Sequence, residues 1–257
     1  MPRAPRPYNV SYSFGPGGIT PAVKALLAAN IGMFVAELLY PALVPLLGLA
    51  PRAVLGAGWL WQPVTYMFLH HTGGFGHILF NMLALWMFGV ELERLWGTVF
   101  FLKFYFVSGI GAALTTIIVS LLPFSFSSGV YLATTVGASG ALYGLLLAYA
   151  YYYPDRPILM FLLFPIPAKY FVMILGAIAF LSSIAGGSGV AHATHLGGLI
   201  AGYLYLKSGR GGLSAELKYR WVKWRMNRLR RKFDVHTGGR DAAGGRGENA
   251  RWDRTIH

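Results

Sequence analysis

The sequence of 257 residues contains no cysteine and few charged residues. Without cysteine the chain has no disulfide, no thiolate metal site and no cysteine nucleophile. Charged residues make up 12% of the chain, hydrophobic residues make up 55%, and the mean hydropathy is +0.51. Soluble domains carry about 25% charged residues. This composition therefore excludes an ordinary soluble domain and indicates a protein that crosses a membrane several times.

Acidic residues are the scarcest charged class: nine Asp and Glu stand against 22 Lys and Arg, and the net charge is +13. Residues 207–257 hold 14 of the Lys and Arg and five of the Asp and Glu, so most of the excess lies there. The basic stretch from Ser214 to Phe233 is typical of a segment held against anionic lipid, with a helix packed between membrane and protein as the alternative. We therefore expect a lipid bilayer, and no nucleic acid, as the partner of this charge.

Long apolar runs predict six membrane-spanning helices, at about 20 residues for each crossing. They lie at 22–47, 75–90, 98–122, 138–153, 169–185 and 189–206. The predicted fold class is all-α, a polytopic six-helix membrane domain over 22–206. It follows an amino-terminal segment (1–21) and precedes a basic, partly disordered tail (207–257). The fourth run is about 24 Å long, less than the roughly 30 Å of hydrocarbon, so its first residue is expected below the outer surface.

The positions of Lys and Arg predict the orientation of these helices, because short basic connections stay in the cytoplasm. The amino-terminal segment, the second and fourth connections and the tail are basic, whereas the third connection, at 122–137, has no Lys or Arg. Both termini are therefore expected in the cytoplasm. The second, fourth and sixth helices then run inward from the outer face.

Four polar residues lie near the outer ends of these three helices. His77 and Asn81 are one turn apart on the second helix, Ser139 begins the fourth, and His195 lies about two turns into the sixth. Polar residues inside a membrane are costly and are candidates for function. Because the three helices run in the same direction, we expect the four side chains to meet at a similar depth.

These residue types suit acyl transfer. A serine hydroxyl needs a neighbouring base, which the imidazole of His195 supplies to Ser139. His77, Asn81 and the free backbone N–H of Ser139 are suitable donors to an oxyanion, and Tyr143, one turn after Ser139, can stack on the imidazole. Small residues on the same helices allow close approach of their backbones. We predict structural roles for Gly137, Gly140, Gly144, Gly198 and Gly202.

Other interpretations of these residues remain open. A serine among glycines in a membrane helix is more often a packing feature than a nucleophile, and a membrane histidine can relay protons. Three histidines can bind zinc, but the sequence lacks the usual zinc-protease spacing and we expect no metal. For His70, His71 and His192 we favour interfacial or packing roles. Near Glu91 and Arg94 we expect a structural ion pair or a hydrogen bond to a loop.

The segments "HILFN", "GASGALYG" and "AHATHLGG", in this order, resemble the rhomboid family of intramembrane serine proteases over residues 55–206. The resemblance implies that Ser139 is the nucleophile and His195 the base. It also implies that His77 and Asn81 stabilise the oxyanion and that Tyr143 stacks on the base. The segment "ELERLWG" is similar to the family pattern after the second helix, which implies a structural hydrogen-bonding role for Glu93.

One departure from the family concerns the first connection, where Gln62 follows Trp61 although the family usually has arginine. This substitution raises a question about how that loop is anchored. The resemblance otherwise implies the basic six-helix bacterial form in the inner membrane. Such a form has no cofactor and acts on single-span or polytopic membrane proteins.

Two classes of function follow from the resemblance. The first is a protease that cleaves transmembrane substrates near their outer ends. The alternative is a non-catalytic, rhomboid-like membrane chaperone or adaptor. Because both Ser139 and His195 are present, we favour the protease. A transporter is a third class. Glu37 is the one acidic residue within the predicted spans, and the lack of a second argues against a transporter.

Overall fold

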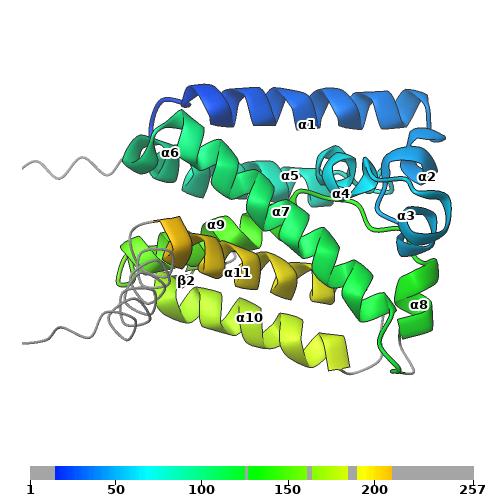
Figure 1. Cartoon of the computed structure of the whole chain (residues 1–257). Coiled ribbons are helices and arrows are strands. Elements are labelled where there is room, and N and C mark those ends of the chain that lie inside the picture. The colour runs from blue at the N-terminus through cyan, green and yellow to red at the C-terminus, as the bar shows by residue number, and fades with distance from the viewer. Residues whose placement is uncertain (1–14, 125–126, 161–163, 185–189, 210–257) are drawn as a thin grey trace, which may run out of the picture. The chain divides into compact units, whose positions relative to one another are not determined.

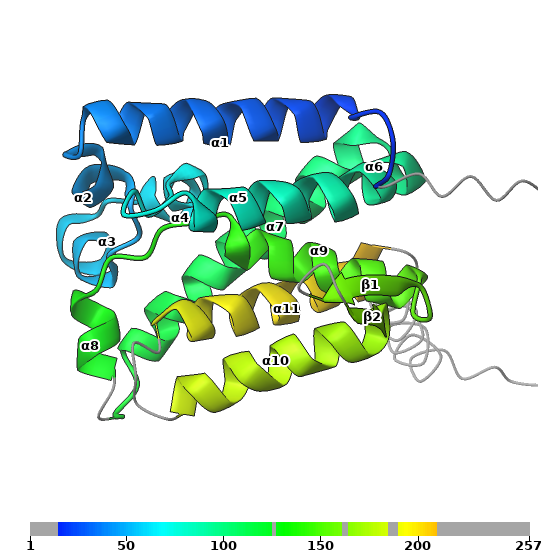
Figure 2. The same cartoon turned by 180° about the vertical axis from the view of Figure 1, so that it is seen from behind.

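The computed structural model of the protein describes residues 15–124, 127–160, 164–184 and 190–209. The described chain is mostly helical, as predicted (Figures 1 and 2). The first 14 residues and the predicted basic tail beyond residue 209 lie outside the described ranges. The connection at 185–189 also lies outside them.

The first predicted span, 22–47, is wrong in its second half. Helix α1 (Pro21–Leu39) ends there, and a separate short helix, α2 (Leu43–Leu47), follows. Pro41 is the cause, because it has no N–H and disfavours helical angles at the preceding residue. Tyr40 accordingly has a φ of −133°.

The first connection contains short helices, which lie with α2 near one end of α1, while α8 lies on the far side of α3 (Figures 1 and 2). They are α3 (Pro51–Ala57), α4 (Gln62–Thr65) and a single 3₁₀ turn, η1 (Tyr66–Phe68). Side chains of α4 hold the loop, since Trp61 and Gln62 both donate to the carbonyl of Leu46. The aromatic residues Trp59, Trp61, Tyr66 and Phe68 of this connection are therefore part of a folded segment.

The second predicted helix, 75–90, is longer than its apolar run. It consists of α5 (Gly76–Ala84), a π-helical turn, η2 (Leu85–Gly89), and α6 (Val90–Trp96), with helical angles at every junction. The charged residues that follow the apolar run form its last turns. The helix ends at Gly97, whose φ of 77° favours glycine.

The remaining four predicted helices match the structure to within a few residues. They are α7 (Thr98–Ser120), α9 (Ser139–Tyr152), α10 (Ala168–Ile184) and α11 (Val190–Gly209), with the short α8 (Ser127–Leu132) before α9. Helices α7, α9 and α11 pack on one another, and α10 lies against α11 and α9 (Figures 1 and 2).

The prediction of an all-helical chain needs one correction. Strands β1 (Pro157–Met160) and β2 (Phe164–Pro167) form an antiparallel hairpin between α9 and α10, with Ile158 opposite Ile166. Both segments contain proline, which disfavours a helix. A two-stranded hairpin tolerates proline because each strand has a free edge.

Two described helices, α1 and α7, are long and apolar enough to cross a membrane by length and composition. A shorter apolar helical stretch covers Ala168–Ser182. Helix α9, with 14 residues, is about 21 Å long. It is therefore too short to cross about 30 Å of hydrocarbon by itself.

Candidate active site

Ser139 and His195 lie close together in the structure. Ser139 is the first residue of α9 and His195 lies on α11, and the distance from Oγ of Ser139 to Nε2 of His195 is 2.8 Å. Both residues are half-buried, so the pair is shielded but not sealed. A serine hydroxyl at this distance from a neutral imidazole can transfer its proton to the ring during attack on a carbonyl carbon.

Two glycines allow the helices of this pair to approach closely. A Cβ atom on Gly198 of α11 would lie 1.9 Å from the carbonyl oxygen of Gly140 on α9. One turn further along, a Cβ atom on Gly202 would lie 3.0 Å from Cα of Gly144. Any larger residue at 198 would therefore separate the backbones and, with them, Ser139 and His195.

The imidazole of His195 is held on one face. The ring of Tyr143, one turn after Ser139, stacks on it with a centroid distance of 4.1 Å and an interplanar angle of 7°. Nδ1 of His195 is buried and has no hydrogen-bond partner among the described residues. Among the described residues, the orientation of this imidazole therefore depends on ring stacking and packing rather than on a neighbouring carboxylate.

The segment before Ser139 is hydrogen-bonded to the first connection and to the residue that precedes it. Leu49 and Thr135 exchange backbone hydrogen bonds, and the N–H of Gly137 donates to the carbonyl of Tyr66. Gly137 has a φ of 127°, and a Cβ atom there would lie 3.0 Å from Nε2 and Cε1 of His77. Glycine is thus required both by the backbone angle and by the imidazole that lies against it.

His77 and Asn81 lie on α5 one turn apart. The amide of Asn81 donates to the carbonyl of His77 at 2.7 Å, which uses one of its two hydrogens. Nδ1 of His77 accepts the backbone N–H of His71 at 3.2 Å. A neutral His77 therefore carries its proton on Nε2, the nitrogen that lies against Gly137.

Two other histidines named from the sequence, His192 and His70, lie near the imidazoles of His195 and His77. The rings of His192 and His195 are 6.3 Å apart, and those of His70 and His77 are 5.2 Å apart. Among the described residues no group of three or more His, Cys, Asp or Glu is arranged to hold a metal ion.

Glu93 lies on α6, at the opposite end of the second predicted helix from His77. Its carboxylate accepts the hydroxyls of Thr20 and Thr98 and the backbone N–H groups of Ala22 and Val23. It thereby caps the first turn of α1 and ties that helix to α6 and α7.

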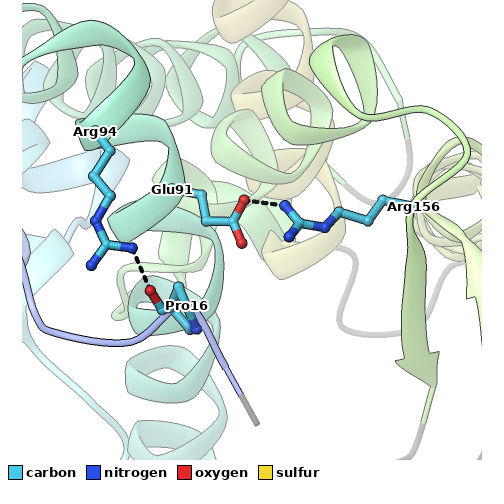
Figure 3. A network of polar contacts seen from close by, with 4 residues as sticks. All are labelled: Pro16, Glu91, Arg94 and Arg156. Carbon is cyan, nitrogen blue, oxygen red and sulfur yellow. Dashed lines mark hydrogen bonds and ion pairs between the residues drawn. The ribbon is translucent and has the colours of Figure 1, made fainter. Parts of the chain in front are cut away.

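A second network joins neighbouring residues at the same end of the helix (Figure 3). Glu91 pairs with Arg156, which precedes β1, and the guanidinium of Arg94 donates to the carbonyls of Pro16 and Gly18. These contacts are the ion pair and the loop hydrogen bonds that we expected near Glu91 and Arg94.

Gln62 anchors the first connection, although it replaces the usual arginine. It is fully buried, its side-chain oxygen accepts the N–H of Ala50 at 3.0 Å, and its amide group donates to the carbonyls of Pro45 and Leu46. The neutral amide satisfies groups at the end of α2 without bringing a charge into the protein. No sequence pattern predicted these three bonds, because their partners are all backbone groups.

The protein is thus a mostly helical, strongly apolar chain in which a serine and a histidine on two helices share a hydrogen bond. A model of the rhomboid domain matches residues 57–209. The chain therefore belongs to the rhomboid family, and the resemblance drawn from its three motifs is confirmed.

Three curated relatives illustrate this membership. Rhomboid protein 1, mitochondrial, of Saccharomyces cerevisiae is 36% identical over 51% of this chain and 37% of its own length. Rhomboid protease AarA of Providencia stuartii is 37% identical over 58% of this chain and 56% of its own. Rhomboid protease GluP of Bacillus subtilis is 31% identical over 61% of this chain and 27% of its own. The matched region thus spans between about a quarter and just over half of these relatives.

Proposed function

We propose that the protein is an intramembrane serine endopeptidase that cleaves transmembrane proteins near the outer membrane face. The observation that carries this proposal is the 2.8 Å contact between Oγ of Ser139 and Nε2 of His195. During attack on the scissile carbonyl, Oγ bonds to carbon and His195 takes the hydroxyl proton. His195 then gives this proton to the leaving amine nitrogen. A water molecule repeats the sequence on the acyl-enzyme, which releases the acid and restores Ser139.

The oxyanion formed in each step needs donors in a fixed place. The proposed donors are Nε2–H of His77, the second amide hydrogen of Asn81 and the backbone N–H of Ser139. The first is supported by the bond from His71 to Nδ1 of His77, which leaves the proton on Nε2. The third is supported by the position of Ser139 at the start of α9, where an N–H has no partner within the helix. This chemistry uses no metal or cofactor.

The proposed membrane arrangement has six crossings: α1, the continuous helix from α5 to α6, α7, α9, α10 and α11. Basic residues in the connections favour both termini in the cytoplasm. Helix α9 then begins below the outer surface, where Ser139 can meet a substrate helix and water. Relatives named as proteases in two bacteria support a bacterial inner membrane, although another relative is named as mitochondrial.

The proposed substrates are single-span or polytopic membrane proteins, and a panel of them tests the proposal. The purified protein is incubated in detergent or liposomes with single-span substrates that differ near their outer ends. Cleavage is expected with the wild type and not with Ser139→Ala. Ser120→Ala is the matched control, because Ser120 is buried on α7 and its hydroxyl donates only locally, to the carbonyl of Ile117. Cleavage that survives in Ser139→Ala would assign the activity to another residue or a contaminant.

A further inference from the structure

Glu37 is a carboxylate that neither the motifs nor the proposed chemistry explains. It lies near the end of α1 and is 1% exposed. A buried carboxylate in an apolar helix is costly unless it is hydrogen-bonded. Its two oxygens accept the backbone N–H of His70, at 3.0 and 3.2 Å. The carboxylate thus fixes one peptide of the first connection directly to α1.

That peptide lies next to the group that binds His77. The following residue, His71, donates its backbone N–H to Nδ1 of His77 at 3.2 Å. The side chain of His70 is itself fully buried, with its ring 5.2 Å from the ring of His77. Only φ and ψ of His70 separate its N–H from that of His71. Because the buried His70 side chain leaves little room for these two angles to change, fixing the N–H of His70 restricts where the N–H of His71 can point.

The bond to Nδ1 determines what His77 can do. When Nδ1 accepts a hydrogen bond, the proton of a neutral imidazole lies on Nε2. Nε2 lies against Gly137, where a Cβ atom would be 3.0 Å from Nε2 and 3.7 Å from Oγ of Ser139. The donor edge of His77 thus lies beside the nucleophile, and its tautomer depends on the backbone that Glu37 holds.

We propose that Glu37 is a positioning residue for His77. It holds the backbone of His70 and His71 so that the N–H of His71 meets Nδ1 and Nε2 remains a donor. This inference rests on the proposed function, in which His77 binds the oxyanion. Outer partners that orient a functional histidine typically change activity 10- to 100-fold when they are removed, and we expect an effect of that size on kcat.

The test measures kcat, KM and thermal stability for Glu37→Met and Glu37→Gln in the full chain. Methionine fills the volume but accepts no strong hydrogen bond, so we expect a kcat about 10- to 100-fold lower with KM little changed. Glutamine keeps an oxygen acceptor for the N–H of His70 and is expected to recover most of this loss. Glu93→Gln is the matched control: Glu93 is a second buried carboxylate that joins α1 to another part of the protein, and its substitution should lower stability without lowering kcat.

A double-mutant cycle with His77→Ala separates positioning from general stability. Once His77 is absent, Glu37→Met should lower kcat no further. An unchanged kcat in Glu37→Met, or an equal loss with and without His77, would overturn the inference. If Glu37→Met does not fold, His71→Pro removes the N–H that binds Nδ1, and the same loss of kcat is expected. A normal kcat in His71→Pro would also overturn it.

Failure of the proposed function gives a different result. If His77→Ala alone keeps the wild-type kcat, His77 is not an oxyanion donor and the assignment of the site is wrong. If His77→Ala lowers kcat and Glu37→Met does not, only the role of Glu37 is wrong.

Discussion

At the scale of single residues, the site depends on how His195 and His77 are oriented. In the proposed chemistry each imidazole uses one nitrogen, Nε2, and the rest of each ring contacts a different partner. Tyr143 stacks on His195 at 4.1 Å, whereas a backbone N–H holds Nδ1 of His77. The sequence indicated which side chains would meet, because their depths in three parallel helices agreed. It did not indicate the bond from His71, because a backbone donor in a loop leaves no mark in the residue pattern.

Asn81 provides a prediction at this scale. Asn81→Ala should lower kcat by roughly 100- to 1,000-fold, because it removes one oxyanion donor, with little change in KM or melting temperature. Asn30→Ala is the matched control, since the amide of Asn30 also donates to the carbonyl one turn earlier, that of Leu26 on α1. Steady-state kinetics on one cleaved substrate compares the two variants. If both change stability alone, Asn81 has only a structural role.

At the scale of elements, proline and glycine determine where the apolar runs become helices. The run at 22–47 is interrupted at Pro41, and the segments around Pro157 and Pro165 form a hairpin instead of extending a helix. The second predicted helix continues past residue 90 to Trp96, because nothing breaks the helix before Gly97. The boundaries of the last four predicted helices agree with the structure to within a few residues. The folded first connection could not be predicted, since its stability depends on side chains such as Gln62 that bind distant backbone groups.

Gln62 provides the prediction at this scale. Gln62→Leu should lower the free energy of unfolding by about 1–3 kcal/mol, because the buried N–H of Ala50 loses its acceptor. Gln62→Arg should also be less stable than the wild type, since arginine donates hydrogen bonds but cannot accept one from the N–H of Ala50. Unfolding in detergent measures both changes. The control is Trp61→Phe, which removes a more exposed bond to Leu46 and should cost less. Equal effects of Gln62→Leu and Trp61→Phe would contradict this account.

At the scale of the whole molecule, the first connection links α1 to the site, and the glycines of α9 and α11 set the distance between Ser139 and His195. The sequence predicted the order of the helices along the chain. It did not predict the 2.8 Å contact, because that distance depends on how closely Gly198 approaches Gly140 in the packed structure. The family match at 57–209 covers this region but not α1.

His70 in the first connection makes stability depend on pH. Burial and, to a smaller extent, the neighbouring His77 lower the pKa of His70 from 6.5 to about 4. As the pH falls, His70 is therefore protonated in the unfolded chain at a higher pH than in the folded protein. The contribution of neutral His70 to stability is complete above pH 6.5 and is lost as the pH falls toward 4. Melting temperatures between pH 7 and 4 should fall less steeply for His70→Asn than for the wild type. Identical slopes would show that His70 does not titrate in this way.

The central claim, that His195 activates Ser139 as a nucleophile, can be measured without a known substrate. A fluorophosphonate reagent forms a covalent bond with an activated serine, and the mass of the intact, cysteine-free protein reports one added group. The account predicts that the wild type is labelled at Ser139. It also predicts that Ser139→Ala and His195→Ala, still folded by their melting temperatures, are not labelled, because nucleophile and base act as a unit. A folded wild-type protein that stays unlabelled, or a His195→Ala variant labelled as fast as the wild type, would contradict it.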